Sequence, residues 1–247
     1  MSPIRVLDRD LINSVARIAP EKLNALESFH IEHNPCAVFT NDQKFSFSVN
    51  TESKEIKLPT AALEYLWCAC YAFYVTYQEY SAANARSSSD FDINGNQRIR
   101  EALSLYQWGR EQLQQAAPRE WPSDKAKPDI SATAIEDVRV ANELYLCAAA
   151  WIMHHEFAHI FHNHKNTPIN NNESRVQEAE ADKSATAWIL DGVCDEAELK
   201  KRGLGHPITH NLSVTGIHGT AGLQREGKRS DLLHAFPDGF GTGVTVV

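Results

Sequence analysis

The chain has 247 residues and a formal net charge of −8, with 43% hydrophobic and 23% charged residues. This composition is typical of a folded globular protein, and it excludes a collagen-like or low-complexity chain. A chain with more acidic than basic residues has no net positive charge with which to neutralise the phosphates of a nucleic acid. We therefore expect no nucleic-acid partner.

Neither a membrane partner nor an extracellular location is expected. The N-terminus lacks the apolar run of a signal peptide, and the apolar run over 144–153 is too short to span a bilayer. The five cysteines are odd in number and include no Cys-x-x-Cys pair, which indicates reduced thiols rather than disulfides or a thiolate zinc site. We therefore expect a cytoplasmic protein; the sequence does not indicate its oligomeric state.

The first sixty residues predict two short helices followed by a small sheet. The helices lie within 7–31 and are broken at Ala19-Pro20. Three segments between about residues 37 and 58 have strand composition, namely 37–40, 45–49 and 55–58. Because short turns separate these segments, we expect an antiparallel sheet.

The remainder is predicted to be mainly helical. A long helix should begin after Pro59, with Thr60 as its N-cap, and further helices are expected at about 97–115, 138–164 and 174–190. From Gly203 onwards glycines accumulate and the periodicity ends. We expect an α+β fold, with a single domain over 1–202 and a Gly-rich, loop-like tail over 203–247 that includes a short strand near residue 244.

Asp90–Glu101 fits the twelve-residue template of a calcium-binding loop, with Gly95 at position six. However, Gln97 and Arg98 occupy positions eight and nine, where the template has other residue types. The alternative is a loop that caps the following helix through Asp and Asn side chains. Calcium is therefore the less favoured of the two interpretations.

The predicted helix 138–164 carries the motif His155-Glu156-x-x-His159. Residues four apart share a helix face, so both imidazoles can reach one cation. Glu156 lies about 100° around the helix from His155, beside the metal, where it can accept a proton from the attacking water. This pattern is typical of a zinc hydrolase with two His ligands and a carboxylate base.

A catalytic zinc ion takes three protein ligands, and the third is expected from the helix 174–190. Glu178 and Asp182 are four residues apart and share a face. Glu178 can complete a His–His–Glu site, while Asp182 can accept the second ring N–H of a ligand histidine. Glu180 should point away from the metal. Ser174 and Gln177 predict a capping box, and Ala179, Ala181 and Ala185 should allow the two helices to approach closely.

Two further histidines on the motif helix are predicted to lie outside the metal site. His154 should point away from the zinc face in a structural role. His162 shares the face of His155, but a fourth protein ligand would close the site, so we leave it out of the ligand set. The metzincin pattern is excluded, because Lys165 stands where its third histidine would be.

His155-Glu156-Phe157-Ala158-His159, followed by Glu178-Ala179-Glu180-Ala181-Asp182, resembles the gluzincin metallopeptidases. Among them the chain is most similar to the Lit-type phage-exclusion peptidases of bacteria, with ImmA/IrrE-type proteases second. The resemblance implies a zincin-like domain, a zinc ion held by His155, His159 and Glu178, and Glu156 as the base. At its most specific it implies cleavage of a translation factor, elongation factor Tu, during phage infection.

In gluzincins a Tyr or His after the third ligand stabilises the oxyanion. No Tyr follows Tyr145, which leaves His206, His210, His218 and His234 as candidates. The predicted function is a zinc endopeptidase that acts on a protein substrate. Two alternatives remain: a regulatory protein with a structural zinc site, and a calcium-binding module built on 90–101.

Overall fold

The computed structural model describes residues 2–86, 91–131 and 133–203. Its elements confirm the predicted α+β class. In chain order they are η1 (Pro3–Leu7), α1 (Asp8–Arg17), η2 (Pro20–Lys22), α2 (Leu23–His33), β1 (Cys36–Thr40), β2 (Ser48–Asn50), β3 (Glu55–Pro59), α3 (Thr60–Ala85), α4 (Gln97–Gln112), α5 (Glu136–Phe161), α6 (Asn171–Leu190) and α7 (Glu196–Gly203).

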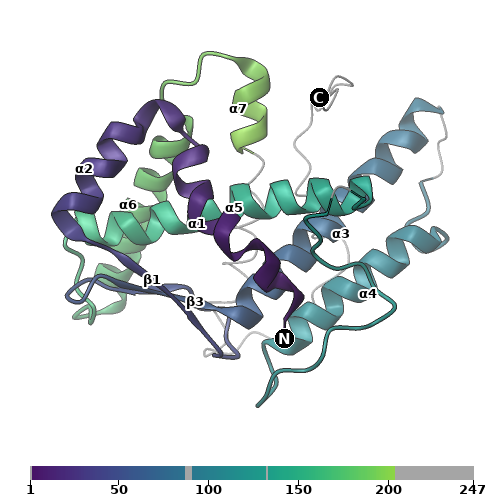
Figure 1. Cartoon of the computed structure of the whole chain (residues 1–247), viewed down its shortest axis with the longest axis horizontal. Helices are drawn as coiled ribbons and strands as arrows, with labels where there is room; N and C mark the ends of the chain where they lie inside the picture. The colour runs from purple at the N-terminus through teal and green to yellow at the C-terminus, as the bar shows by residue number, and fades with distance from the viewer. Residues whose placement is uncertain (1, 87–90, 132, 204–247) are drawn as a thin grey trace.

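The two longest helices, α3 and α5, form the centre of the molecule, because both carry apolar residues around most of their circumference. They pack on each other, and the buried Trp67 on α3 donates a hydrogen bond from Nε1 to Asn142 Oδ1 on α5 at 2.8 Å. Helix α4 covers α3, while α1 and α6 cover α5 (Figure 1). In the part of the chain that is described, no helix combines the length and apolar character needed to cross a membrane.

The sheet is mixed, so the predicted all-antiparallel arrangement is wrong. Its order is β1-β3-β2: β2 pairs antiparallel with β3, but β1 pairs parallel with β3. The connection over 41–47 carries the chain from one edge of the sheet to the other. Phe45 in this connection packs against Tyr65 on α3, with 5.6 Å between ring centroids. The predicted strand 45–49 is therefore reduced to β2, because its first residues contribute to the core.

The turn between β2 and β3 is fixed to the segment that follows α5. Asn50 Oδ1 accepts hydrogen bonds from the backbone N–H groups of Glu52 and Ser53, which is an Asx-type turn. Thr51 then donates from its backbone N–H to Asn166 Oδ1 and from Oγ1 to the carbonyl of His164, both at 2.8 Å. These bonds hold β2 beside the C-terminal end of α5.

Small residues bring α6 against α5, although the predicted set needs correction. Ala181 and Ala185 are completely buried, whereas Ala179 is exposed and lies outside the interface. The predicted Ser174 cap is also wrong, since Asn170 Oδ1 accepts the Glu173 N–H and α6 begins one turn earlier. The early start lets Glu173 accept the Ile169 N–H as well.

Two other sequence predictions differ from the structure. Thr60 does not cap α3: Pro59 is its N-cap, and the Thr60 hydroxyl donates instead to the Thr40 carbonyl on β1. Helix α7 was not predicted; the buried Arg202 attaches it to η2 through a two-point ion pair with Glu21, at 2.6 and 3.1 Å. The tail 204–247, with its predicted strand near residue 244, lies outside the described residues.

Candidate metal centre

The last turns of α5 present His155 and His159 on one face, as the four-residue spacing predicts. Their Nε2 atoms are 3.1 Å apart. Both side chains are largely buried, with 12% of each exposed. Burial, together with the neighbouring His155, lowers the pKa of His159 to about 4, so this ring is neutral and offers a lone pair to a cation.

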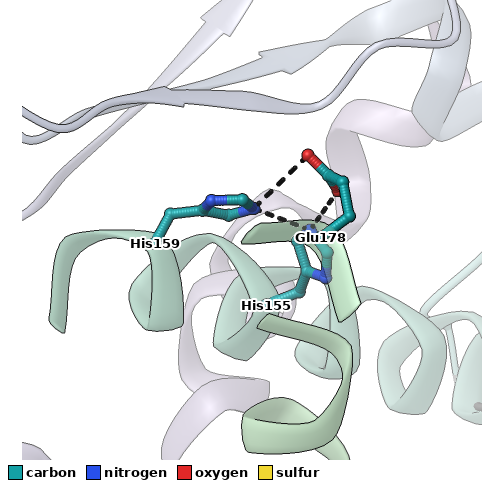
Figure 2. A group of neighbouring side chains, drawn as sticks. All are labelled: His155, His159 and Glu178. Carbon is teal, nitrogen blue, oxygen red and sulfur yellow. Dashed lines mark hydrogen bonds and ion pairs between the residues drawn. The ribbon is translucent and has the colours of Figure 1, made fainter. Parts of the chain in front are cut away.

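Glu178 reaches the same point from α6. Its carboxylate oxygens lie 3.2 Å from His155 Nε2 and 3.8 Å from His159 Nε2, and Figure 2 shows the three side chains pointing toward one another. The hydrogen bond from His155 lowers the pKa of Glu178, which keeps it ionised. Half of this side chain is exposed, so the group is open to solvent on the Glu178 side.

The spacing of these three donors fits a zinc ion. Tetrahedral zinc with bonds of about 2.0–2.1 Å requires ligand atoms roughly 3.3 Å apart. The two imidazole Nε2 atoms are 3.1 Å apart, and each has an oxygen of Glu178 near it, Oε2 at 3.2 Å from His155 and Oε1 at 3.8 Å from His159. Two imidazoles with one carboxylate are a donor set found in catalytic zinc sites. Among the described residues these are the His, Cys, Asp and Glu side chains grouped closely enough to hold a metal.

Glu156 is buried between α5 and the sheet, with 5% of the residue exposed. Burial raises its pKa to about 7, and the negative charge of Glu178 acts in the same direction. The positive charge of His155 opposes this shift, and so does a hydrogen bond to the Val49 backbone of β2. The carboxyl group therefore lies next to an edge strand and within the electrostatic influence of His155 and Glu178.

Asp182 lies one turn after Glu178 on α6, and its Oδ1 is 2.9 Å from His155 Nδ1. This hydrogen bond keeps one proton of His155 on Nδ1, so Nε2 is the atom that would bind a metal, in exchange for the proton it carries in the metal-free chain. Although burial alone would lower the pKa of His155, the hydrogen bonds to Asp182 and Glu178 raise it to about 10. The same negative surroundings favour a bound cation.

Asp182→Ala is expected to weaken zinc binding by about 10–100-fold without unfolding the chain, because it removes the group that orients His155. Asp182→Asn keeps an oxygen that can accept the hydrogen bond, so it should lose less. Competition with a graded series of zinc chelators measures both effects. Unchanged zinc affinity in Asp182→Ala would contradict the orienting role.

The remaining histidines of α5 have other partners. His154 is buried, its Nε2 is 3.1 Å from the carbonyl of Val15 on α1, and its ring stacks on Trp188, as expected for a structural residue. Burial lowers its pKa to about 4. His162 Nε2 is 2.9 Å from Ser184 Oγ and its Nδ1 is 3.5 Å from Glu180, so both ring nitrogens face α6, and His162 is not part of the three-residue group.

Sequence analysis missed His164, which lies just beyond the end of α5. It is buried, and its ring contacts both His159 and Glu180. Glu180 thus accompanies His162 and His164 rather than the three donor atoms, which agrees with its predicted orientation. A signal was available in the sequence: Asn163 is a residue type that ends helices in the left-handed conformation.

Two sets of predicted residues lie wholly or partly beyond the described ranges. The first set is the calcium template, whose first residue, Asp90, is not described. In its described part, Asn96 Oδ1 caps α4 by accepting the Ile99 N–H, and Glu101 accepts a hydrogen bond from Gln97 within the helix. These contacts favour the capping interpretation. The oxyanion candidates His206, His210, His218 and His234 also fall outside the described residues.

Two helices next to a small sheet thus hold a histidine pair, an adjacent buried carboxylate and a second acidic side chain, and three of these residues are grouped closely enough to hold a metal ion. The chain belongs to the Peptidase U49 family, whose model matches residues 56–221. It is 36% identical over 209 residues to the cell death peptidase of Escherichia coli (strain K12), a match that covers 83% of this chain and 70% of the relative. No solved structure matches the chain.

These matches confirm the predicted resemblance to the Lit-type peptidases rather than to the ImmA/IrrE type. The chain is therefore a peptidase. The family match contains all four residues of the candidate centre, since His155, Glu156, His159 and Glu178 lie within 56–221.

Proposed function

We propose that this chain is a zinc-dependent endopeptidase that hydrolyses a peptide bond within a protein substrate. The observation that carries the proposal is the convergence of His155, His159 and Glu178 from two helices at the spacing of a zinc site, with Glu156 buried beside them. A structural zinc site would have no need of this additional carboxylate.

The chemistry is divided between the metal and Glu156. Bound zinc would supply a Lewis acid that polarises the scissile carbonyl and lowers the pKa of water. Glu156 accepts a proton from the attacking water as the oxygen bonds to the carbonyl carbon. When the C–N bond breaks, the same carboxyl group delivers that proton to the leaving amine nitrogen.

The sheet offers a surface for an extended substrate. β2 is the edge strand nearest α5, and its Val49 backbone bonds to Glu156. An extended peptide that added to this edge would place its backbone next to the base. A hollow of about 450 Å³ begins where β2 ends, at Thr51, and is lined on its other side by His164 to Thr167, so it could receive a side chain of the same peptide.

The resemblance to the Lit-type peptidases supports a role in phage exclusion, with a bacterial translation factor as the substrate. The similarity to a cell death peptidase supports the same role, because hydrolysis of a translation component stops growth of the host cell. We expect the partner to be a folded protein that presents an extended loop to β2.

Metal removal tests the proposed function. The purified full chain should contain about one zinc per molecule, lose cleavage of elongation factor Tu after treatment with a strong chelator, and regain it on addition of one equivalent of Zn²⁺. Mapping of new peptide termini in a treated bacterial extract would reveal a different substrate. Undiminished cleavage by the metal-free chain would overturn the zinc-dependent mechanism.

A further inference from the structure

The end of α5 is a Schellman motif, and this local structure determines where His164 lies. Asn163 adopts a left-handed conformation with φ of 53°, and its N–H donates to the Ile160 carbonyl at 3.1 Å. The His164 N–H donates to the His159 carbonyl at 3.0 Å. In this motif the chain turns back so that the second residue past the cap contacts the residue five positions earlier, usually through apolar side chains.

Here two imidazoles make that contact, and one of them belongs to the candidate metal centre. His164 Nδ1 is 2.8 Å from His159 Nδ1, and His164 Nε2 is 3.0 Å from Glu180 Oε2. His164 is buried with 6% of its side chain exposed, and the Thr51 hydroxyl holds its carbonyl. The ring is therefore fixed by the helix end, by α6 and by the β2–β3 turn.

Only one arrangement of protons satisfies these contacts when His159 Nε2 binds a cation. His159 must then carry its proton on Nδ1 and donate it to His164 Nδ1. His164 in turn carries its proton on Nε2 and donates it to the ionised Glu180, which has no proton of its own to give. The hydrogen bonds run in one direction, from the metal side toward the carboxylate.

We propose that His164 and Glu180 form a two-residue relay that positions His159 as a metal ligand. The inference rests on the proposed zinc site and adds positioning residues to it. It is the counterpart of the direct bond from His155 to Asp182, so each ligand histidine is oriented by a carboxylate of α6. His159 needs an intermediary, because Glu180 points away from the donor atoms.

The relay is tested with zinc affinity in the full chain, measured by chelator competition. His164→Ala should weaken zinc binding by about 10–100-fold, the usual cost of losing such a supporting group. The matched control is His33→Ala, which makes the same change at a histidine of α2 that contacts Glu32 and Phe29, and which should bind zinc as the wild type does. The absorption spectrum of the Co²⁺-substituted chain should change in His164→Ala and remain unchanged in His33→Ala.

A double-mutant cycle tests the second link, from His164 to Glu180. Glu180→Ala should weaken zinc binding less than His164→Ala does, and its effect should disappear when His164 is already alanine. An equal effect of Glu180→Ala in both backgrounds would overturn the relay. If His164→Ala fails to fold, Glu180→Ala alone decides, since its half-exposed side chain can be removed without opening the core.

The outcomes separate the relay from the proposed function. Absence of zinc binding by the wild type would overturn both. Normal zinc binding by the wild type with unchanged affinity in His164→Ala would overturn the relay alone. A loss of affinity matched by an equally large loss of thermal stability in the metal-free variant would assign His164 a merely structural role and would also overturn the relay.

Discussion

Glu156→Gln is expected to abolish peptide-bond hydrolysis while the chain keeps about one zinc ion. Glutamine preserves the size of the buried side chain but cannot accept a proton at neutral pH. Positioned general bases contribute about 10²–10⁴-fold to rate, so the variant should lose at least that factor in kcat, with a much smaller change in KM. Cleavage assays, together with metal analysis of the same preparation, measure both quantities.

A matched control is Glu143→Gln, which makes the same chemical change at an exposed position of the same helix and should leave cleavage unchanged. Retained turnover in Glu156→Gln would contradict the peptidase mechanism. Loss of biological function together with loss of cleavage in Glu156→Gln would instead contradict the regulatory alternative, because a structural zinc site keeps its function without a base. Full biological function with no proteolysis in the variant would favour that alternative.

The residues of the candidate centre could be predicted because their positions depend on the spacing of residues within single helices. The His155–His159 spacing requires only a helix, and the Glu178–Asp182 spacing requires only a second helix packed beside the first. The structure brings these four residues together as that periodicity predicts. The spacing also separates Glu180 from Glu178 around α6, and Glu180 indeed contacts other residues.

The errors concern interactions that a local pattern does not encode. The predicted strand 45–49 is shortened where Phe45 packs on Tyr65 of α3, a contact between distant segments that competes with strand pairing. Threonine is a favoured N-cap residue type, yet the Thr60 hydroxyl donates to the Thr40 carbonyl on β1 instead. Tertiary contacts thus override local propensity in both cases.

His164 was missed for a different reason. Its role depends on Asn163, whose left-handed backbone conformation ends the helix and turns the chain back. Helical periodicity therefore no longer applies at residue 164. A helical projection carried through residue 164 places its side chain on the wrong side. If Asn163 is taken as the left-handed residue of a Schellman motif, His164 is expected to contact His159, and the sequence alone indicates this contact.

Glu178→Ala is expected to lose bound zinc more severely than any variant that only removes an orienting group. It leaves two protein ligands where catalytic zinc uses three, whereas loss of a supporting hydrogen bond costs about 10–100-fold in affinity. His155→Ala and His159→Ala should behave in the same way, since each removes one of the three donors. Chelator competition ranks the variants on one scale.

Glu180→Ala is the comparison on the same helix. It removes a carboxylate two residues from Glu178, but this carboxylate is not one of the proposed metal ligands. It should retain stoichiometric zinc with reduced affinity. Zinc should raise the melting temperature of the wild type and of Glu180→Ala through preferential binding to the folded state, and it should leave Glu178→Ala unaffected. Wild-type zinc affinity in Glu178→Ala, or an experimental structure with His162 or Glu180 on the metal, would show that α6 supplies a different ligand or none.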